Sequence, residues 1–163
     1  MPLATATQSM DSKVQDIVNG LPQSESELQS WNAAQKWAAV AEAFFGSAVI
    51  PSFTPLGLEA GKAAFVGAAL TLMASPQELN PGALAAGFTA FAAIAAVPGN
   101  VSPTPPVVHA PPAGPLDLTA LSTLPASETT MPSTTALHGI LLAWATTGTQ
   151  TTPGTPPVVV PWS

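Results

Sequence analysis

The chain contains no cysteine, no tyrosine and no arginine, and few of its 163 residues are charged. Without cysteine it can form neither a disulfide framework nor a thiolate metal site. Charged residues make up 7% of the chain, against about 25% in ordinary soluble proteins. The protein therefore does not keep itself soluble by surface charge.

Basic residues are scarce and lie early in the chain, and the net charge is -6. The three lysines are Lys13, Lys36 and Lys62. The charged side chains that follow them are Glu78, Asp117 and Glu128, so the last hundred residues are nearly neutral. Proteins that bind nucleic acid contact phosphates mainly through Lys and Arg. We therefore expect no nucleic-acid partner.

Side chains suited to catalysis are few and poorly placed. His109 stands in proline-rich sequence with no acidic residue within seven positions, and His138 follows the apolar Leu137. A surface or packed role suits both histidines better than catalysis, because a general base needs a positioned partner. No HxxxH, HExxH, calcium-loop, P-loop or GxGxxG pattern occurs. We expect a non-enzymatic protein without catalytic residue, cofactor or metal site.

Long apolar runs are also missing. The apolar segments Ala63 to Ala74 and Ala83 to Val97 are shorter than the ~20 residues that a membrane-spanning helix needs. No Lys or Arg follows Lys62 to anchor such a helix. This disfavours a membrane protein, although a membrane-associated hairpin of the two segments remains an alternative. The stretch Met1 to Met10 has no basic region followed by an apolar one, so we expect no secretory signal.

A helical signature, however, appears four times. An apolar residue is followed seven positions later by an aromatic residue that an alanine precedes, as in Trp37 with Phe44, Leu58 with Phe65, Leu84 with Phe91, and Leu137 with Trp144. Seven residues are about two helical turns, so each pair lies on one face. The signature predicts similar Ala-rich helices, with Trp31, Trp37, Phe65, Phe91 and Trp144 as packing residues.

Capping signals predict where these helices begin. A short amphipathic helix is expected over 11–21, and a Ser24-x-x-Glu27 capping box precedes a helix that reaches Phe45. Thr54-Pro55 and Asn80-Pro81 each combine an N-cap residue with proline at the first helical position. The two helices align at an offset of 26 residues, which matches Gly61 with Gly87 and Phe65 with Phe91. They look like a duplicated helix whose small residues permit close packing.

Proline divides the chain into parts, since thirteen of the nineteen prolines lie beyond Val97. We predict a mainly α protein: a small bundle of Ala-rich helices over 1–97, a proline-rich and Ser/Thr-rich connector over 98–132, an isolated helix over 133–148, and an extended proline-rich arm over 149–163. The segment Thr104-Pro105-Pro106-Val107-Val108 recurs as 155–159. Such repetition indicates units that pack on copies of themselves, within one chain or between chains.

The parts without local partners are the expected interface. On the connector and the arm we expect contacts through Val107, Val108, Val158, Val159 and Trp162, and on the isolated helix through Leu137 and Trp144. Interfaces of this kind have apolar, aromatic centres with few charges. For Trp162 the alternative is that it folds back onto the protein's own helices, since buried aromatics dominate cores as well as interfaces.

A short chain of Ala-rich helices followed by Thr/Gly/Pro sequence, such as residues 145–155, resembles the small structural proteins of tailed-phage virions. The resemblance is one of composition and style along the chain, and no motif carries over residue by residue. It implies a multi-copy subunit of a tail, baseplate or capsid that assembles in the host cytoplasm and contacts other structural subunits. A second resemblance, to secreted Ala/Pro-rich bacterial binding proteins, is disfavoured by the expected lack of a signal sequence.

Overall fold

The computed structural model describes residues 3–21, 23–30, 32–70, 80–103, 106–121 and 130–163, and these residues are mainly helical, as predicted. The α-helices are α1 (Thr7–Asn19), α2 (Glu25–Ser30), α3 (Ala33–Phe45), α4 (Pro55–Ala69), α5 (Pro81–Ala93) and α6 (Met131–Ala145). Short 3-10 helices are η1 (Leu3–Thr5), η2 (Ile94–Ala96) and η3 (Thr119–Leu121). The strands are β1 (Ser52–Phe53), β2 (Val101–Ser102), β3 (Val108–Ala110), β4 (Thr149–Thr152) and β5 (Val158–Pro161).

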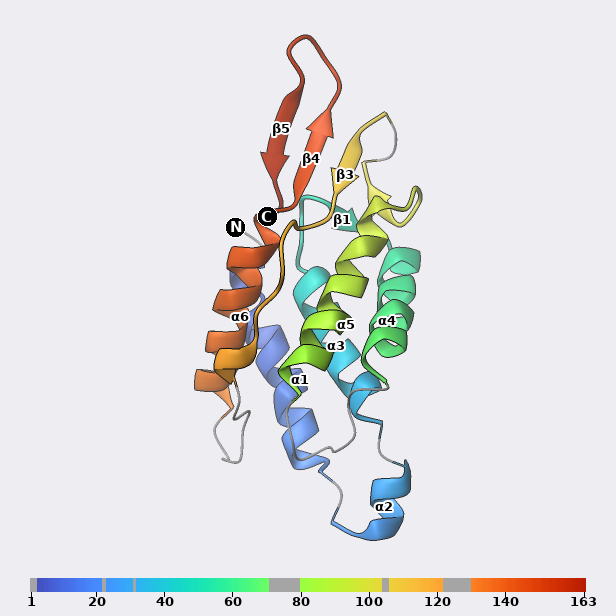
Figure 1. The fold of residues 1–163 in the computed structure, drawn as a ribbon, viewed down its shortest axis with the longest axis vertical. Coiled ribbons are helices and arrows are strands. Elements are labelled where there is room, and N and C mark those ends of the chain that lie inside the picture. Colours follow the sequence, from blue (N-terminus) through green and yellow to red (C-terminus); the bar gives the residue numbers. More distant parts are fainter. Residues whose placement is uncertain (1–2, 22, 31, 71–79, 104–105, 122–129) are drawn as a thin grey trace.

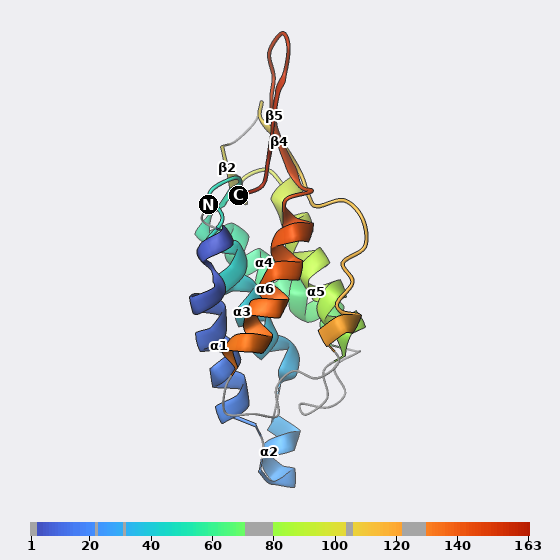
Figure 2. The ribbon, with the colours of Figure 1, turned by 90° about the vertical axis from the view of Figure 1, so that its left-hand side faces the viewer.

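The molecule is elongated and its two ends differ in structure. Figure 1 shows α2 at one end, and the hairpin of β4 and β5 standing out from the other. The view turned by 90° in Figure 2 shows the same separation, with the long helices between the ends. None of the helices in the described part of the chain combines the length and the apolar character needed to cross a membrane.

Helix α3 lies at the centre of the helical part and buries two sides. It contacts α1 on one side and α4 and α5 on others. Phe44 and Phe45 have no exposed surface, and the ring of Phe45 stacks on that of Phe91 with centroids 4.7 Å apart. Trp37 is also buried. The buried apolar side chains of the described helices join in one core cluster.

The helix predicted from the capping box to Phe45 is wrong in one respect, because the structure divides it into α2 and α3. Ser24 Oγ accepts a hydrogen bond from the Glu27 backbone N–H at 3.3 Å, so the predicted start holds. Asn32 then caps a new helix, since its Oδ1 accepts from the Gln35 backbone N–H at 3.0 Å. Asn is among the best N-cap residues. Trp31, expected in the core, lies outside the described residues.

Helices α4 and α5 begin where the sequence predicts. Thr54 Oγ1 accepts from Gly57 N and Asn80 Oδ1 from Ala83 N, each at 3.0 Å, so both predicted N-caps are present. The helices form the most extensive helix–helix contact among the described elements.

The aligned glycines and phenylalanines of this pair meet reciprocally. A Cβ atom built on Gly61 would lie 2.4 Å from Phe91 Cε1, and one built on Gly87 would lie 2.7 Å from Phe65 Cε2. Each ring therefore occupies the space that the partner helix leaves open by having glycine, which lets the two antiparallel helices approach closely. Phe65 and Phe91 are both fully buried, as predicted.

The prediction of an isolated helix over 133–148 is wrong. The helix is α6, which begins two residues earlier without a side-chain cap and packs against α1, η1 and η3. Its N-terminal turn is held by Asp11 of α1, whose Oδ1 accepts from Thr130 Oγ1 at 2.6 Å and from Thr134 Oγ1 at 2.8 Å. Asp11 is buried with 3% exposure. These contacts link residues more than a hundred positions apart, which local sequence patterns do not reveal.

The proline-rich connector and the predicted arm contribute strands. β1 pairs with β2, and a second sheet has the order β3-β4-β5 with both neighbouring pairs antiparallel. Residues 149–163 therefore form a hairpin that returns to the body, where the sequence predicts extended chain. Trp162 has no exposed surface and lies edge-on to Phe45 and Phe53, with ring centroids 6.5 and 6.2 Å away.

Candidate interaction surface

Residues 46–56, the described residues of 97–110, and residues 146–163 meet at the end of the molecule that carries both sheets, and we call this the sheet end (Figure 1). Thr54 N donates to Asn100 O at 3.0 Å, beside the β1–β2 pair. Ser163 N donates to Ile50 O at 2.9 Å, and Val49 N to Ser163 O at 2.8 Å. Three segments distant in sequence are thus joined by backbone hydrogen bonds.

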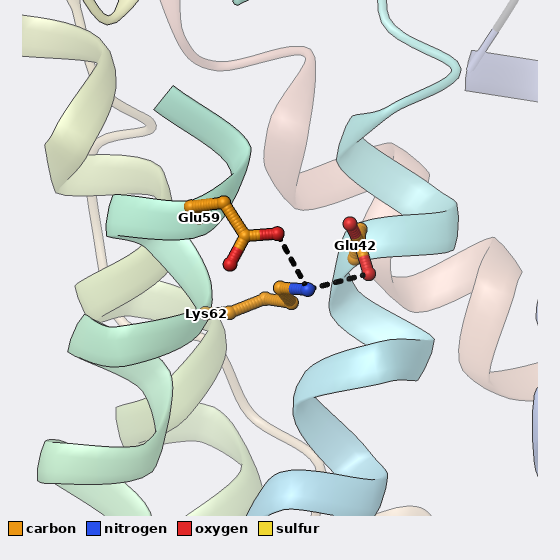
Figure 3. A network of polar contacts seen from close by, with 3 residues as sticks. All are labelled: Glu42, Glu59 and Lys62. Carbon is orange, nitrogen blue, oxygen red and sulfur yellow. Dashed lines mark ion pairs between the residues drawn. The ribbon is translucent and has the colours of Figure 1, made fainter. Parts of the chain in front are cut away.

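No Asp, Glu, Lys or Arg occurs in any of these three segments. All of the net charge of -6 is carried by the rest of the chain. Figure 3 shows the polar network between α3 and α4, where Lys62 Nζ lies 2.9 Å from Glu59 Oε1 and 3.3 Å from Glu42 Oε2. The hydrogen bond to Glu59, reinforced by Glu42, raises the pKa of Lys62 above its ordinary value despite partial burial.

The other shifted group also lies outside the sheet end. The hydroxyl and backbone N–H of Thr119 both donate to Asp117 Oδ1, at 2.6 and 2.9 Å, and lower the pKa of that carboxyl. The sheet end therefore contains neither of the two groups whose pKa is shifted, and His109 is its one histidine.

Exposed apolar side chains gather at this uncharged end. Six of the eight large hydrophobic side chains that are exposed among the described residues belong to it: Val49, Leu56, Val97, Val108, Val158 and Val159. Single exposed apolar residues are normal on any protein surface, whereas a concentration of them marks a site of interaction. The sheet end is the strongest such concentration in the described structure.

The sheet contains one valine from the equivalent position of each Thr-Pro-Pro-Val-Val segment. Val108, in the first copy, pairs with Thr151 on one side of β4, and Val159, at the equivalent position of the second copy, pairs with Thr151 on the other side. Ala110 and Pro161, which each follow the paired valine by two residues, likewise lie on either side of Thr149. The two copies thus flank β4 within a single chain and do not pair with each other.

Alternation along the strands gives the three-stranded sheet two different faces. The outer face carries Val108, Ala110, Thr149, Thr151, Val159 and Pro161, none of which is buried. The inner face carries the row His109, Gln150 and Val160, which lies closer to the helices and is buried or half-buried. Val158 and Thr152 also project from the inner side, but at the distal part of the hairpin, where both are exposed.

The inner face holds polar atoms that lack partners in the described structure. His109 Nε2 lies 2.8 Å from Pro103 O, while His109 Nδ1, Gln150 Oε1 and Trp162 Nε1 are buried without a hydrogen bond. Beside this face, a hollow of about 170 Å³ lies between η2 and β3 and is lined mostly by apolar residues, among them Val97, Val101 and Val107. The hollow contains one imidazole and no charged group, so it offers apolar contact rather than acid–base chemistry.

The seven residues predicted to form the interface divide between the surface and the core. Val108, Val158 and Val159 are exposed at the sheet end, and Val107 is half-buried beside the hollow. The interface prediction is wrong for Leu137, Trp144 and Trp162, which are 0%, 7% and 0% exposed and belong to the chain's own core. For Trp144, this burial confirms the other prediction, that it is a packing residue. Trp162 follows the alternative in which it folds back on the helices.

Three residues of the surface were missed from the sequence. Val49 and Val97 each stand shortly before a proline at the exit of a helical segment, and Leu56 occupies the first turn of α4. None of them belongs to a repeat or an aromatic signature. The absence of charge from 46–56 is the signal that could have found two of them.

Chemically reactive groupings are sparse in the described structure. His138 Nε2 lies 2.7 Å from Leu3 O, and its ring stands edge-on to Phe44, so this histidine is packed rather than paired with an acid. Among the described residues, no three His, Asp or Glu side chains are placed to hold a metal ion. The chain matches no family model, no curated protein and no solved structure.

Proposed function

We propose that the chain is a non-enzymatic structural subunit of a multi-copy protein assembly, of the kind that builds the tail, baseplate or capsid of a phage virion. The helices act as one bundle that forms the body of the subunit, and the sheet end, with its projecting proline-rich hairpin as an arm, contacts neighbouring subunits. The proposed partners are structural proteins, including further copies of this chain.

The observation that carries this proposal is the coincidence of three properties at one end of the molecule. The sheet end lacks charge, exposes six large apolar side chains and projects from the body as a hairpin. Interface centres are depleted in charge and enriched in apolar contact. A projecting element can reach a neighbour without bringing the charged bodies together.

The distribution of charge supports the same arrangement. Lys13, Asp16, Glu25, Glu27 and Lys36 lie on α1, α2 and α3, away from the projecting hairpin (Figure 2). Groups of like charge on neighbouring subunits repel one another when they are brought close together. Contact through the sheet end leaves these groups hydrated and widely spaced, so assembly carries little electrostatic cost.

The test is the mass of the purified chain as a function of concentration, measured by sedimentation or light scattering. We expect the 16.4 kDa chain to form larger species as its concentration rises. The triple variant Val108→Asp, Val158→Asp and Val159→Asp should remain monomeric. A charge-matched control, Asn19→Asp, Gln23→Asp and Ser26→Asp, changes exposed residues near the α2 end and should assemble like the unmodified chain.

Three outcomes would contradict the proposal. One is a chain that stays monomeric at every concentration and in the presence of its co-expressed neighbouring subunits. Another is loss of assembly in the control but not in the sheet-end variant. A monomer that sediments with lipid vesicles would instead support the membrane alternative.

A further inference from the structure

The outer edge of β5 is blocked against the addition of another strand. Trp162 N donates to Gly148 O at 3.0 Å, so these two residues form a hydrogen-bonded pair. Hydrogen-bonded and non-hydrogen-bonded pairs alternate along an antiparallel pair of strands. The next hydrogen-bonded pairs between β4 and β5 are therefore Gln150–Val160 and Thr152–Val158. The N–H of Val159 then points away from β4, and the outward positions on either side of it are Pro157 and Pro161. Proline has no N–H to donate, and prolines on a strand edge prevent edge-to-edge pairing.

The opposite edge of the sheet is short, because β3 has only three residues. On the inner face of this strand, His109 Nε2 lies 2.8 Å from Pro103 O. A partner at the sheet end therefore has no long free edge to extend. What remains open is the outer face, with its exposed valines in the row Val108–Thr151–Val159.

This row is nearly symmetric about its centre. Val108 and Val159 come from equivalent positions of the two Thr-Pro-Pro-Val-Val segments, so Thr151 is flanked by the same side chain on both sides. Two copies of the sheet can stack with their outer faces together and a two-fold axis beside Thr151. The axis then places the row of one copy against the same row of the other. Symmetric self-contact of this kind, in which a patch meets itself, is the commonest mode of oligomer formation.

We propose that the outer face binds the outer face of a second copy of this chain, with Thr151 next to Thr151 across a two-fold axis. The inference deepens the proposed function and rests on it, because it assigns the self-contact to one face of one sheet. A second copy suits this face because it is uncharged and apolar on both sides of the contact, while each chain keeps its net charge of -6 away from the interface. The β-branched Val and Thr side chains of two such rows can interdigitate, as in stacked sheets.

The two neighbouring valines of β5 supply a matched pair of variants. Val158 and Val159 are the same residue type and are 59% and 56% exposed, but they project from opposite sides of the sheet. We expect Val159→Asp to raise the dissociation constant of the dimer at least about 30-fold, because it buries an unpaired carboxylate in the contact. Val158→Asp adds the same charge one residue away and should leave the constant within about threefold, as rim charges typically do.

Because the chain lacks cysteine, a single introduced thiol shows which residues lie next to each other across the contact between two copies. Thr151→Cys should form a covalent dimer on mild oxidation, whereas Thr152→Cys, on the opposite side of the same strand, should not. Circular dichroism of all four variants should match the unmodified chain, since each position is exposed or half-exposed.

The outcomes separate this inference from the proposed function. If the unmodified chain assembles but Val158→Asp weakens the dimer as much as Val159→Asp, or Thr152→Cys cross-links in place of Thr151→Cys, the outer-face contact is wrong while self-assembly stands. If the unmodified chain is monomeric at every concentration and Thr151→Cys fails to cross-link, the self-contact itself is overturned.

Discussion

The indole ring of Trp162 lies directly against Gly148: a Cβ atom at Gly148 would be 2.7 Å from Trp162 Cδ2. Gly148 lies shortly after α6, and Trp162 directly follows β5, the returning strand of the hairpin, so this contact fixes the base of the projecting sheet to the helical core. The residue that most resembles an interface anchor in the sequence is thereby the one that ties the sheet end to the rest of the chain.

Replacing Trp162 with alanine should therefore unfold the chain more easily rather than merely weaken assembly. Loss of a fully buried Trp side chain costs about 3–5 kcal/mol, which is a large fraction of the stability of a small domain. Trp162→Phe should cost clearly less, because it keeps a ring and removes an indole N–H that is buried without a partner. Urea unfolding followed by circular dichroism measures both, and a Trp162→Ala variant as stable as the unmodified chain would show that the tryptophan is not part of the core.

The Gly–Phe contacts between α4 and α5 predict opposite effects for two glycines of one helix. Gly61→Ala places a methyl group 2.4 Å from Phe91 and should destabilise the fold by about 1–3 kcal/mol, as overpacked cores do. Gly67→Ala in the same helix has no atom within 4 Å of the new methyl group and should stabilise by up to about 1 kcal/mol through helix propensity. Chemical denaturation compares the two directly. Equal signs for the two changes would contradict the close packing.

The ion pairs of Lys62 predict a small, pH-dependent contribution. Its pKa is raised in the folded state by Glu59 and Glu42, so the stabilisation is complete below the ordinary lysine value of 10.5 and is lost as the pH rises through the folded value. Lys62→Met should cost at most about 1 kcal/mol near neutral pH, since solvent screens partly exposed pairs. The difference from the unmodified chain should shrink as the pH rises above the ordinary lysine value of 10.5.

The control for this measurement is Lys13→Met. Lys13 Nζ lies 3.8 Å from Asp16 Oδ2, and both side chains are about half exposed or more. Its replacement should change the free energy of unfolding less than that of Lys62. The difference in the free energy of unfolding between Lys62→Met and the unmodified chain could instead grow as the pH rises. That result would show that the ion pairs do not supply this stabilisation.

Local signals predicted the helices of this chain well, because a cap or a packing repeat acts over a few residues. Thr54 and Asn80 begin their helices by bonds to the residue three positions on, and the Gly61–Phe65 spacing repeats in α5 as one packing unit. Asn32 also caps a helix through the residue three positions on, and this signal was missed because the apolar pattern continues on both sides of it.

The sheet end could have been predicted in part. Pro153-Gly154-Thr155-Pro156 stands between two runs of β-branched residues, which is typical of a hairpin turn, but its proline content favoured an extended arm. The outer-face valines were found because they repeat. The burial of Trp162 could not be found in this way, since its neighbours Phe45 and Phe53 lie more than a hundred positions earlier.

The buried carboxylate of Asp11 joins α1 to the start of α6, which is distant in sequence, and this contact can be tested by mutation. It accepts hydrogen bonds from Thr130, Thr134 and Gln15, and Thr130 and Thr134 are 1% and 0% exposed. Asp11→Ala leaves the Thr130 hydroxyl buried without its acceptor and should cost about 1–3 kcal/mol. Asp16→Ala, at a side chain that is 68% exposed in the same helix, should change stability by no more than about 0.5 kcal/mol.

A double-mutant cycle then distinguishes this hydrogen bond from simple loss of packing. In Thr130→Val the stranded hydroxyl is removed, so the combined variant Asp11→Ala, Thr130→Val should be less destabilised than the sum of the two single changes. The expected coupling is about 0.5–3 kcal/mol, as for residues in one hydrogen-bond network. Strict additivity in urea unfolding would mean that Asp11 does not hold α6 through Thr130.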